Sequence, residues 1–262
     1  MEVAWIGLGA MGLPTAKKVA AAGHRVRGYD LNLPLPEVAD GLILAASARE
    51  AAQDCDLLCI AVFSDVQVLE VLNGPAGVLR GLRKGAIVAI FTTGSIESVR
   101  QLAATAPPGV MILDTCFSRR FADVKTEMLT LLVGGPTEAI ERARPAFDAF
   151  ARDIIHVGKI GSGRAIKLVN NILYAGQLQL VADALRFAEG LGLEQHATLV
   201  ALTRCSGASD VLEQFLGMGT AEMLDLAHRY MVKDVAAATD AARNAGVDLQ
   251  TLGKVTDVYR AH

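Results

Sequence analysis

The order of apolar and polar residues divides this chain into two parts. Up to about residue 157, short strand-like apolar runs alternate with helical stretches, which is typical of a parallel sheet covered by helices. Strands are expected over residues 3–6, 25–29, 57–62, 86–91, 110–113, 129–133 and 154–157. Helices are expected to begin near Met11, Ser47, Asp65, Ser95 and Pro136.

After Gly161-Ser162-Gly163 the strand-like runs end, and Ala- and Leu-rich helical periodicity continues almost to the last residue. The first helix of this part is expected from roughly Ser162 to Gly190. That is more than twice the mean helix length of about 11 to 12 residues, so we expect it to span two domains. The sequence therefore predicts an α/β domain over residues 1–160, with a mostly parallel sheet. An all-α domain follows over residues 161–262 and begins with the long interdomain helix.

Composition favours a soluble protein that acts on small molecules. The chain has 262 residues, 52% of them hydrophobic, and a net charge of −3, which offers no attraction to nucleic acid or anionic lipid. No basic leader precedes the first strand, and no run of about 18 apolar residues suits a membrane span, so we expect a cytoplasmic location. The four cysteines lack paired C-x-x-C spacing, which indicates reduced thiols and no metal site.

A glycine-rich turn, Gly7-Leu8-Gly9-Ala10-Met11-Gly12, follows the first predicted strand and leads into a helix. This G-x-G-x-x-G pattern is weak evidence alone, but its place between strand and helix is the one that a dinucleotide-binding turn requires. Gly7 would allow the tight turn, Gly9 the approach of the pyrophosphate, and Gly12 close packing of helix on strand. The helix N-terminus would attract the phosphates, so the sheet is predicted to be a Rossmann-type domain.

The second predicted strand ends in Gly28-Tyr29-Asp30, about 20 residues beyond the glycines. A carboxylate there can accept hydrogen bonds from the ribose hydroxyls and would repel a 2′-phosphate, so NAD is favoured over NADP. Arg25, Arg27 and Asn32 lie nearby in the sequence and leave NADP possible as the cofactor. The alternative for Asp30 is a turn-forming residue.

Further motifs follow in a fixed order along nearly the whole chain. They are Thr92-Thr93-Gly94-Ser95, Leu113-Asp114 through Ser118 to Leu131-Leu132-Val133-Gly134-Gly135, Gly158 through Gly163 to Lys167 and Asn170-Asn171, and Lys233-Asp234. With the glycine turn, this order resembles the β-hydroxyacid dehydrogenase family, which includes 3-hydroxyisobutyrate dehydrogenase, tartronate semialdehyde reductase and 6-phosphogluconate dehydrogenase. The resemblance implies a homodimer or homotetramer formed through the helical domain.

The resemblance also implies the roles of individual residues. Lys167 would be the general acid/base, Asn171 would orient the substrate, and Ser118 would bind the substrate carboxylate. The candidate substrate contacts are Thr93, Ser118, Arg119, Arg120, Lys233 and Asp234. The candidate cofactor contacts are Gly7, Leu8, Gly9, Ala10, Met11, Gly12, Asp30, Asn32, Val62, Phe63, Thr93 and Lys233.

The residues themselves support part of this assignment. Lys167, Asn170 and Asn171 are three and four positions apart and share one helix face. A lysine whose pKa is lowered by burial can move the proton of an alcohol. The alternatives are a surface lysine at position 167 and a solvated charge pair at Lys233 and Asp234.

The chain departs from the family pattern after Asp114. The family's Ala-Pro-Val-Ser-Gly-Gly is here Thr115-Cys116-Phe117-Ser118-Arg119-Arg120, so both glycines have become arginine. These arginines either bind a second anionic group of the substrate, or point to solvent, or narrow the pocket and impair turnover of ordinary 3-hydroxy acids. Phe63 also stands where the family has other residues, and it either stacks near the cofactor or packs in the core.

The predicted function is an NAD(P)-dependent oxidoreductase that interconverts a small anionic 3-hydroxy acid and its semialdehyde. A hypothesis from another class is a dinucleotide-binding or scaffolding protein that has lost catalysis, for which Arg119 and Arg120 are the main support. An imine reductase is a third possibility, and Lys167 argues against it. No nucleic acid or membrane partner is expected.

Overall fold

The computed structural model describes residues 1–32, 41–118 and 129–259. It forms two compact units, Met1–Lys167 and Leu168–His262. The predicted substrate contacts Arg119 and Arg120 lie outside the described residues. The predicted domain boundary at residues 160 and 161 stays a prediction.

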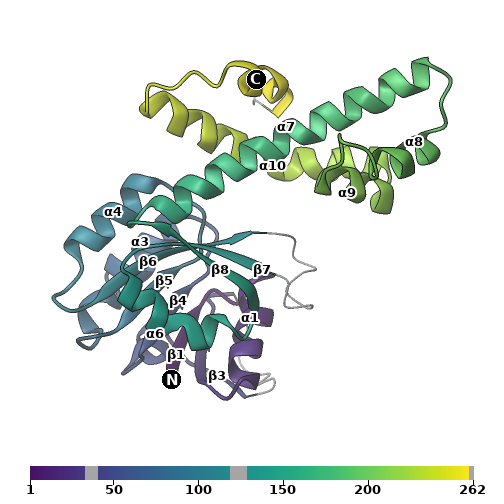
Figure 1. Ribbon diagram of the computed structural model, residues 1–262. Helices are drawn as coiled ribbons and strands as arrows, with labels where there is room; N and C mark the ends of the chain where they lie inside the picture. Colours follow the sequence, from purple (N-terminus) through teal and green to yellow (C-terminus); the bar gives the residue numbers. More distant parts are fainter. Residues whose placement is uncertain (33–40, 119–128, 260–262) are drawn as a thin grey trace. The chain divides into compact units, whose positions relative to one another are not determined.

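Within the described part of the first unit, eight strands form one sheet in the order β3-β2-β1-β4-β5-β6-β7-β8 (Figure 1). Neighbouring strands are parallel except β6 and β7, which are antiparallel. The strands are β1 Glu2–Ile6, β2 Arg25–Tyr29, β3 Leu42–Leu44, β4 Leu57–Ile60, β5 Ile87–Ile90, β6 Met111–Ser118, β7 Leu129–Gly134 and β8 Ala151–Gly158. The predicted α/β fold with a mostly parallel sheet is confirmed.

Helices connect the parallel strands of this sheet. They are α1 Gly12–Ala21, α2 Ala48–Ala52, α3 Asp65–Asn73, α4 Ile96–Thr105 and α6 Thr137–Phe147, with the 3-10 helix η1 Leu79–Gly81. At the predicted starts Ser47, Asp65 and Ser95, a serine caps the helix: the hydroxyls of Ser47, Ser64 and Ser95 each accept a backbone N–H of the first turn. These N-caps explain why the helix starts were readable from the sequence.

Two differences from the predicted strands have simple causes. Strand β3 was not predicted, because the three residues Leu42–Leu44 are too few to show an alternating pattern. Strand β6 continues to Ser118 instead of ending at Leu113, because antiparallel pairing with β7 extends it as far as the Ser118–Thr130 pair. The segment that carries Ser118 is therefore a strand end.

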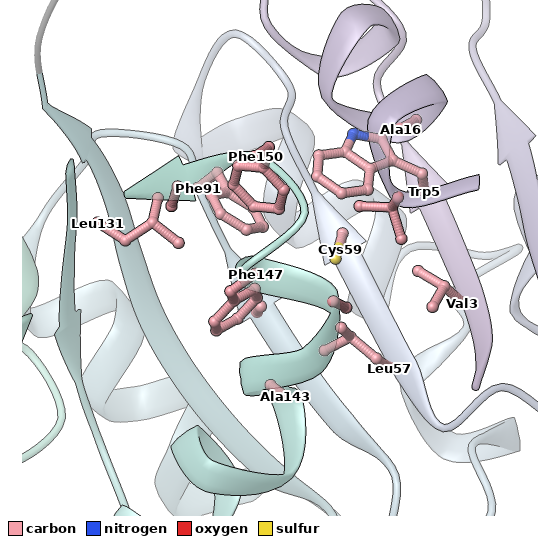
Figure 2. Close-up of a cluster of buried hydrophobic side chains, with 14 of the residues drawn as sticks. Val3, Trp5, Ala16, Leu57, Cys59, Phe91, Leu131, Ala143, Phe147 and Phe150 are labelled. Atoms are coloured by element: carbon pink, nitrogen blue, oxygen red, sulfur yellow. The ribbon is translucent and has the colours of Figure 1, made fainter. Parts of the chain in front are cut away.

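Both faces of the central strands are buried, as is usual for parallel sheets. Along β1, Val3 and Trp5 pack on one face with α1 and α6, and Ala4 and Ile6 pack on the other with α2, α3 and α4. Figure 2 shows the first cluster, in which the Trp5 ring stacks on Phe91 with centroids 5.4 Å apart. Phe91 in turn stacks on Phe117 at 4.6 Å.

The second unit is helical in its described residues. Helix α7, Ser162–Gly190, has the predicted bounds, and the division between the units falls inside it. The other helices are α8 Gln195–Leu202, α9 Asp210–Met218, α10 Thr220–Asn244, α11 Gln250–Val255 and the 3-10 helix η2 Asp257–Tyr259. Apolar residues of α7, α8, α9 and α10 share one core. Among the described residues, none of the helices combines the length and hydrophobicity that a membrane span requires.

Candidate functional site

The strand order reverses between β1 and β4, and in open α/β sheets ligands bind at the carboxyl ends of the strands beside such a reversal. The glycine turn leaves β1 at this point. Gly7 has a φ of +94°, and a Cβ there would lie 2.4 Å from the Ala61 carbonyl oxygen. A Cβ on Gly12 would lie 1.9 Å from the Gly7 carbonyl oxygen. Both glycines are therefore required by the fold of the turn.

Gly9 differs, because a Cβ there would have nothing within 4 Å. The protein itself thus does not require glycine at this position, and the space beside the backbone is open to a ligand. Helix α1 starts three residues later, and its N-cap Met11 makes no side-chain cap hydrogen bond. The first N–H groups of the helix and this bare backbone fit a pyrophosphate.

Asp30 lies directly after β2 and contacts the turn. One carboxylate oxygen accepts the Leu8 N–H at 2.7 Å, and the other accepts the Asn32 N–H at 2.9 Å. Asp30 therefore forms the turn that the alternative interpretation proposed, and it also joins the end of β2 to the glycine turn. Each carboxylate oxygen has a second lone pair for a ribose hydroxyl.

A cavity of about 260 Å³ lies beside Asp30. Its other walls include Leu44, Ala45 and Ala46, which sequence reasoning missed because β3 was not predicted. Arg25 and Arg27, the basic residues that kept NADP open, form ion pairs with Glu2 at 3.5 and 3.7 Å. Both side chains thus bind Glu2, at the start of β1, and not a group at the end of β2, where Asp30 lies.

The loops after β4 and β5 carry the other candidate cofactor contacts of this unit. The Thr92 hydroxyl donates to the Val62 carbonyl oxygen at 2.8 Å and ties the two loops together. Thr93 is half-buried. The Phe63 side chain is 78% exposed, so it does not pack in the core. Core packing, one of the two interpretations of Phe63, is therefore wrong.

The middle of β6 holds the start of α7 through a buried carboxylate. Asp114 accepts the Gly161 N–H at 2.9 Å and the Arg164 N–H at 2.8 Å. Burial raises the pKa of this carboxyl. A Cβ on Gly163 would lie 2.4 Å from the Asp114 carbonyl oxygen, which explains the glycine in the first turn of the helix. The sequence marked Asp114 as part of a motif but not as the cap of α7.

Lys167 follows on α7 and is half-buried, between exposed Ile166 and buried Leu168. Its partial burial argues against a fully solvated surface lysine. Ser118 is half-buried at the end of β6. Among the residues that the structure describes, no group of three or more His, Cys, Asp and Glu side chains is arranged to hold a metal ion.

In the helical unit, Asn171 is 5% exposed and donates its amide N–H to Asp234 on α10 at 2.9 Å. The structure thus brings together two predicted site residues that are 63 positions apart. Asp234 is half-buried and bonded, which contradicts a simply solvated charge, whereas Lys233 beside it is exposed.

Comparison with known proteins gives the same assignment along the chain. Residues 2–158 match the family model described as the NAD binding domain of 6-phosphogluconate dehydrogenase. Residues 161–262 match the model described as NAD-binding of NADP-dependent 3-hydroxyisobutyrate dehydrogenase. Together the two models account for almost every residue.

Individual relatives match over nearly their whole length. The NAD-dependent L-serine dehydrogenase of Pseudomonas aeruginosa is 32% identical over 274 residues, which cover 99% of this chain and 91% of the relative. The 3-sulfolactaldehyde reductase of Escherichia coli is 30% identical over 270 residues, which cover 98% and 88%. A structure of Mycobacterium tuberculosis 3-hydroxyisobutyrate dehydrogenase with L-serine superposes with a TM-score of 0.86 at 28% identity, covering 98% and 91%.

The glycine turn fits a dinucleotide, and both family models describe nicotinamide-dependent dehydrogenases. The resemblance seen in the ordered motifs is confirmed. This chain belongs to the β-hydroxyacid dehydrogenase family and is an NAD(P)-dependent oxidoreductase.

Proposed function

We propose that this protein is an NAD-dependent dehydrogenase that interconverts a small anionic 3-hydroxy acid and its semialdehyde, with Lys167 as the general acid/base. The observation that carries the proposal is the half-buried Lys167 on α7, the helix whose start is held by Asp114 at the carboxyl edge of the sheet. The names of relatives that act on L-serine and 3-sulfolactaldehyde support the substrate class.

NAD is the proposed cofactor. Asp30 offers a negative charge beside the cavity that suits the adenosine ribose, and a 2′-phosphate would meet that charge at short range. Arg25 and Arg27 are paired with Glu2 and do not offset it. The nicotinamide ring, when bound, accepts or supplies the hydride, and the residues of the chain perform the remaining tasks.

Lys167 is proposed to move the proton. During oxidation, a neutral amine at Lys167 Nζ takes the proton of the substrate hydroxyl while the C–H bond of the carbon that carries this hydroxyl breaks. During reduction, the protonated amine donates that proton to the carbonyl oxygen. Such proton transfer contributes about 10²- to 10⁴-fold to the rate of a reaction of this kind.

Ser118 and Asn171 are proposed to bind the substrate. The Ser118 hydroxyl, at the end of β6, can donate to a carboxylate. The second amide N–H of Asn171 is available to orient the substrate while Asp234 holds the first. Arg119 and Arg120 are proposed to favour a second anionic group on the substrate.

The test follows absorbance of the reduced cofactor with purified protein, NAD or NADP, and a panel of L-serine, 3-hydroxyisobutyrate and 2,3-dihydroxypropane-1-sulfonate, with the corresponding aldehydes in the reverse direction. Lys167→Ala should lower kcat by at least about 10²-fold and leave cofactor binding intact. The exposed Lys159→Ala is the matched control. Unchanged turnover in Lys167→Ala would refute the assigned role.

Silence across the panel, despite cofactor binding, would favour a protein that kept the fold and lost this catalysis. Turnover of imines in place of hydroxy acids would favour the imine reductase alternative. Preference for a substrate with two anionic groups would support a role for Arg119 and Arg120.

A homodimer or homotetramer formed through the helical unit is also proposed. Apolar side chains on α7 that are more than half exposed support it, and they are Val169, Leu173, Leu180 and Phe187. Light scattering coupled to size-exclusion chromatography tests the state, and a monomer at micromolar concentration would contradict the proposal.

A further inference from the structure

An ion pair next to the loops after β4 and β5, which carry candidate cofactor contacts, involves a fully buried arginine. Arg164 in α7 has no solvent-exposed side-chain area, and its Nη1 lies 3.0 Å from Asp65 Oδ1. The same nitrogen donates to the Ser95 carbonyl oxygen at 2.5 Å. Asp65 Oδ2 accepts the Ser95 N–H at 2.6 Å. We name this arrangement the Asp65–Arg164 clamp.

The clamp joins α7 to the two segments that follow the neighbouring strands β4 and β5. Asp65 is the first residue of α3 and follows the loop after β4, Ser95 ends the loop after β5, and Arg164 is bonded through its backbone to Asp114 on β6. Because β4, β5 and β6 are parallel, their carboxyl ends meet at one edge of the sheet. The clamp thus links this edge to α7 one turn before Lys167.

The loop after β5 is shaped around the clamp. A Cβ on Gly94 would lie 2.1 Å from Asp65 Oδ1, so the carboxylate occupies the place of a side chain at that position. Gly94 adjoins Thr93, a candidate contact for both cofactor and substrate. The position of Thr93 is therefore set by an interaction with the start of α3 and, through Arg164, with α7.

Stability alone explains this pair poorly. Within the described part of the chain, the Nε and Nη2 atoms of Arg164 are buried and find no hydrogen-bond partner. A buried donor without a partner is unfavourable, and replacing a buried ion pair by apolar residues is often neutral or stabilising. A charge pair that gains little stability but joins two loops to a helix is better explained by the geometry that it imposes.

We propose that Asp65 and Arg164 are positioning residues that hold the loops after β4 and β5 in the geometry needed by the nicotinamide half of the cofactor. The proposal rests on the proposed cofactor site, because these loops carry the candidate cofactor contacts Val62, Phe63 and Thr93, which it assigns to the nicotinamide half. The adenosine half has its own site at the glycine turn and Asp30, which the clamp does not contact.

The test compares two ligands that differ in the nicotinamide. ADP-ribose contains only the adenosine, pyrophosphate and second ribose, whereas NADH contains the nicotinamide as well. In Asp65→Asn and Arg164→Gln, calorimetric titration should give an NADH Kd raised by about tenfold or more, because the loops are no longer preorganised. The Kd of ADP-ribose should stay within about twofold of that of the parent protein. The double variant should match the single variants, since each removes the same interaction.

Arg83→Gln is the matched control. Arg83 is ion-paired with Asp56, and this pair lies where β4 and β5 begin, at the opposite edge of the sheet. Its loss should leave both ligand affinities unchanged. Arg164→Lys keeps the positive charge and should therefore bind NADH more tightly than Arg164→Gln does. Thermal unfolding checks that all variants are folded. Among folded variants, a purely structural role for Arg164 does not predict this partial recovery of NADH affinity.

Equal weakening of NADH and ADP-ribose in folded variants, or no weakening of either, would overturn the proposal. If Arg164→Gln does not fold, Asp65→Asn and Arg164→Lys give the same comparison. Failure of the parent protein to turn over any hydroxy acid would count against the proposed function alone, because the ratio of the two affinities tests the clamp without catalysis.

Discussion

Replacing Gly12 by alanine places a methyl group 1.9 Å from the Gly7 carbonyl oxygen and 3.0 Å from Trp5 Nε1. Such contacts are normally no closer than 3.0 Å, so the start of α1 must move by roughly 1 Å away from the turn. Overpacking of this kind destabilises by about 1–3 kcal/mol. For a protein of this size we expect Tm to fall by about 2–12 °C in Gly12→Ala.

Replacing Gly9 by alanine should leave the stability of the fold intact and weaken cofactor binding. The new methyl group meets no protein atom within 4 Å, and the backbone there is not in the left-handed region. Stability should stay level or rise by about 0.4–1 kcal/mol, because alanine restricts the unfolded chain. The methyl group occupies the space proposed for the pyrophosphate, so the NADH Kd should rise by at least about tenfold, or about 1.4 kcal/mol.

The single tryptophan of the chain makes both effects measurable. Trp5 is fully buried and lies directly beneath Gly12. Its emission overlaps the absorption of NADH, so quenching by energy transfer reports binding, and circular dichroism reports Tm. Wild-type NADH affinity in Gly9→Ala would refute the contact between this backbone and the pyrophosphate. An unchanged Tm in Gly12→Ala would refute the packing argument.

Other predictions concern single residues. Asp30→Ala should raise the NADH Kd by about tenfold or more while affecting NADPH less, in the same fluorescence titration; an equal effect on both would contradict the NAD assignment. Burial raises the pKa of Asp114 above its ordinary value of 3.8, so the folded protein binds more protons than the unfolded chain between the two pKa values. The free energy of unfolding contributed by Asp114 should therefore decline as pH rises through that window, and Asp114→Asn should flatten this part of the pH profile in urea denaturation. Among the four thiols, only exposed Cys205 should react quickly with an aromatic disulfide reagent in the native protein, because the others are buried and burial raises the pKa of Cys55 to about 11 and of Cys116 to about 12. Fast reaction of two or more thiols before unfolding would show that the core is more open than described.

The sequence alone determined the features that depend on short stretches of chain. The alternation of strands and helices predicted the sheet class because central parallel strands are continuously apolar. The bounds of α7 were readable because Gly161 ends the preceding strand region and apolar periodicity continues to Gly190. The glycine turn was predictable because a tight turn and the close packing of a helix on a strand require glycine at positions a fixed distance apart. The structure shows the first requirement at Gly7 and the second at Gly12.

Contacts between residues far apart in the sequence were not predictable and came from the folded structure. Arg164 follows a glycine-rich segment and has the sequence signature of a surface charge, yet it is fully buried against Asp65, about a hundred positions earlier. Asn171 and Asp234 were placed in one site by family resemblance, but their hydrogen bond comes from the packing of α7 against α10. Local spacing carries no information on such contacts, because the energy of a buried polar group depends on partners that the fold brings from elsewhere.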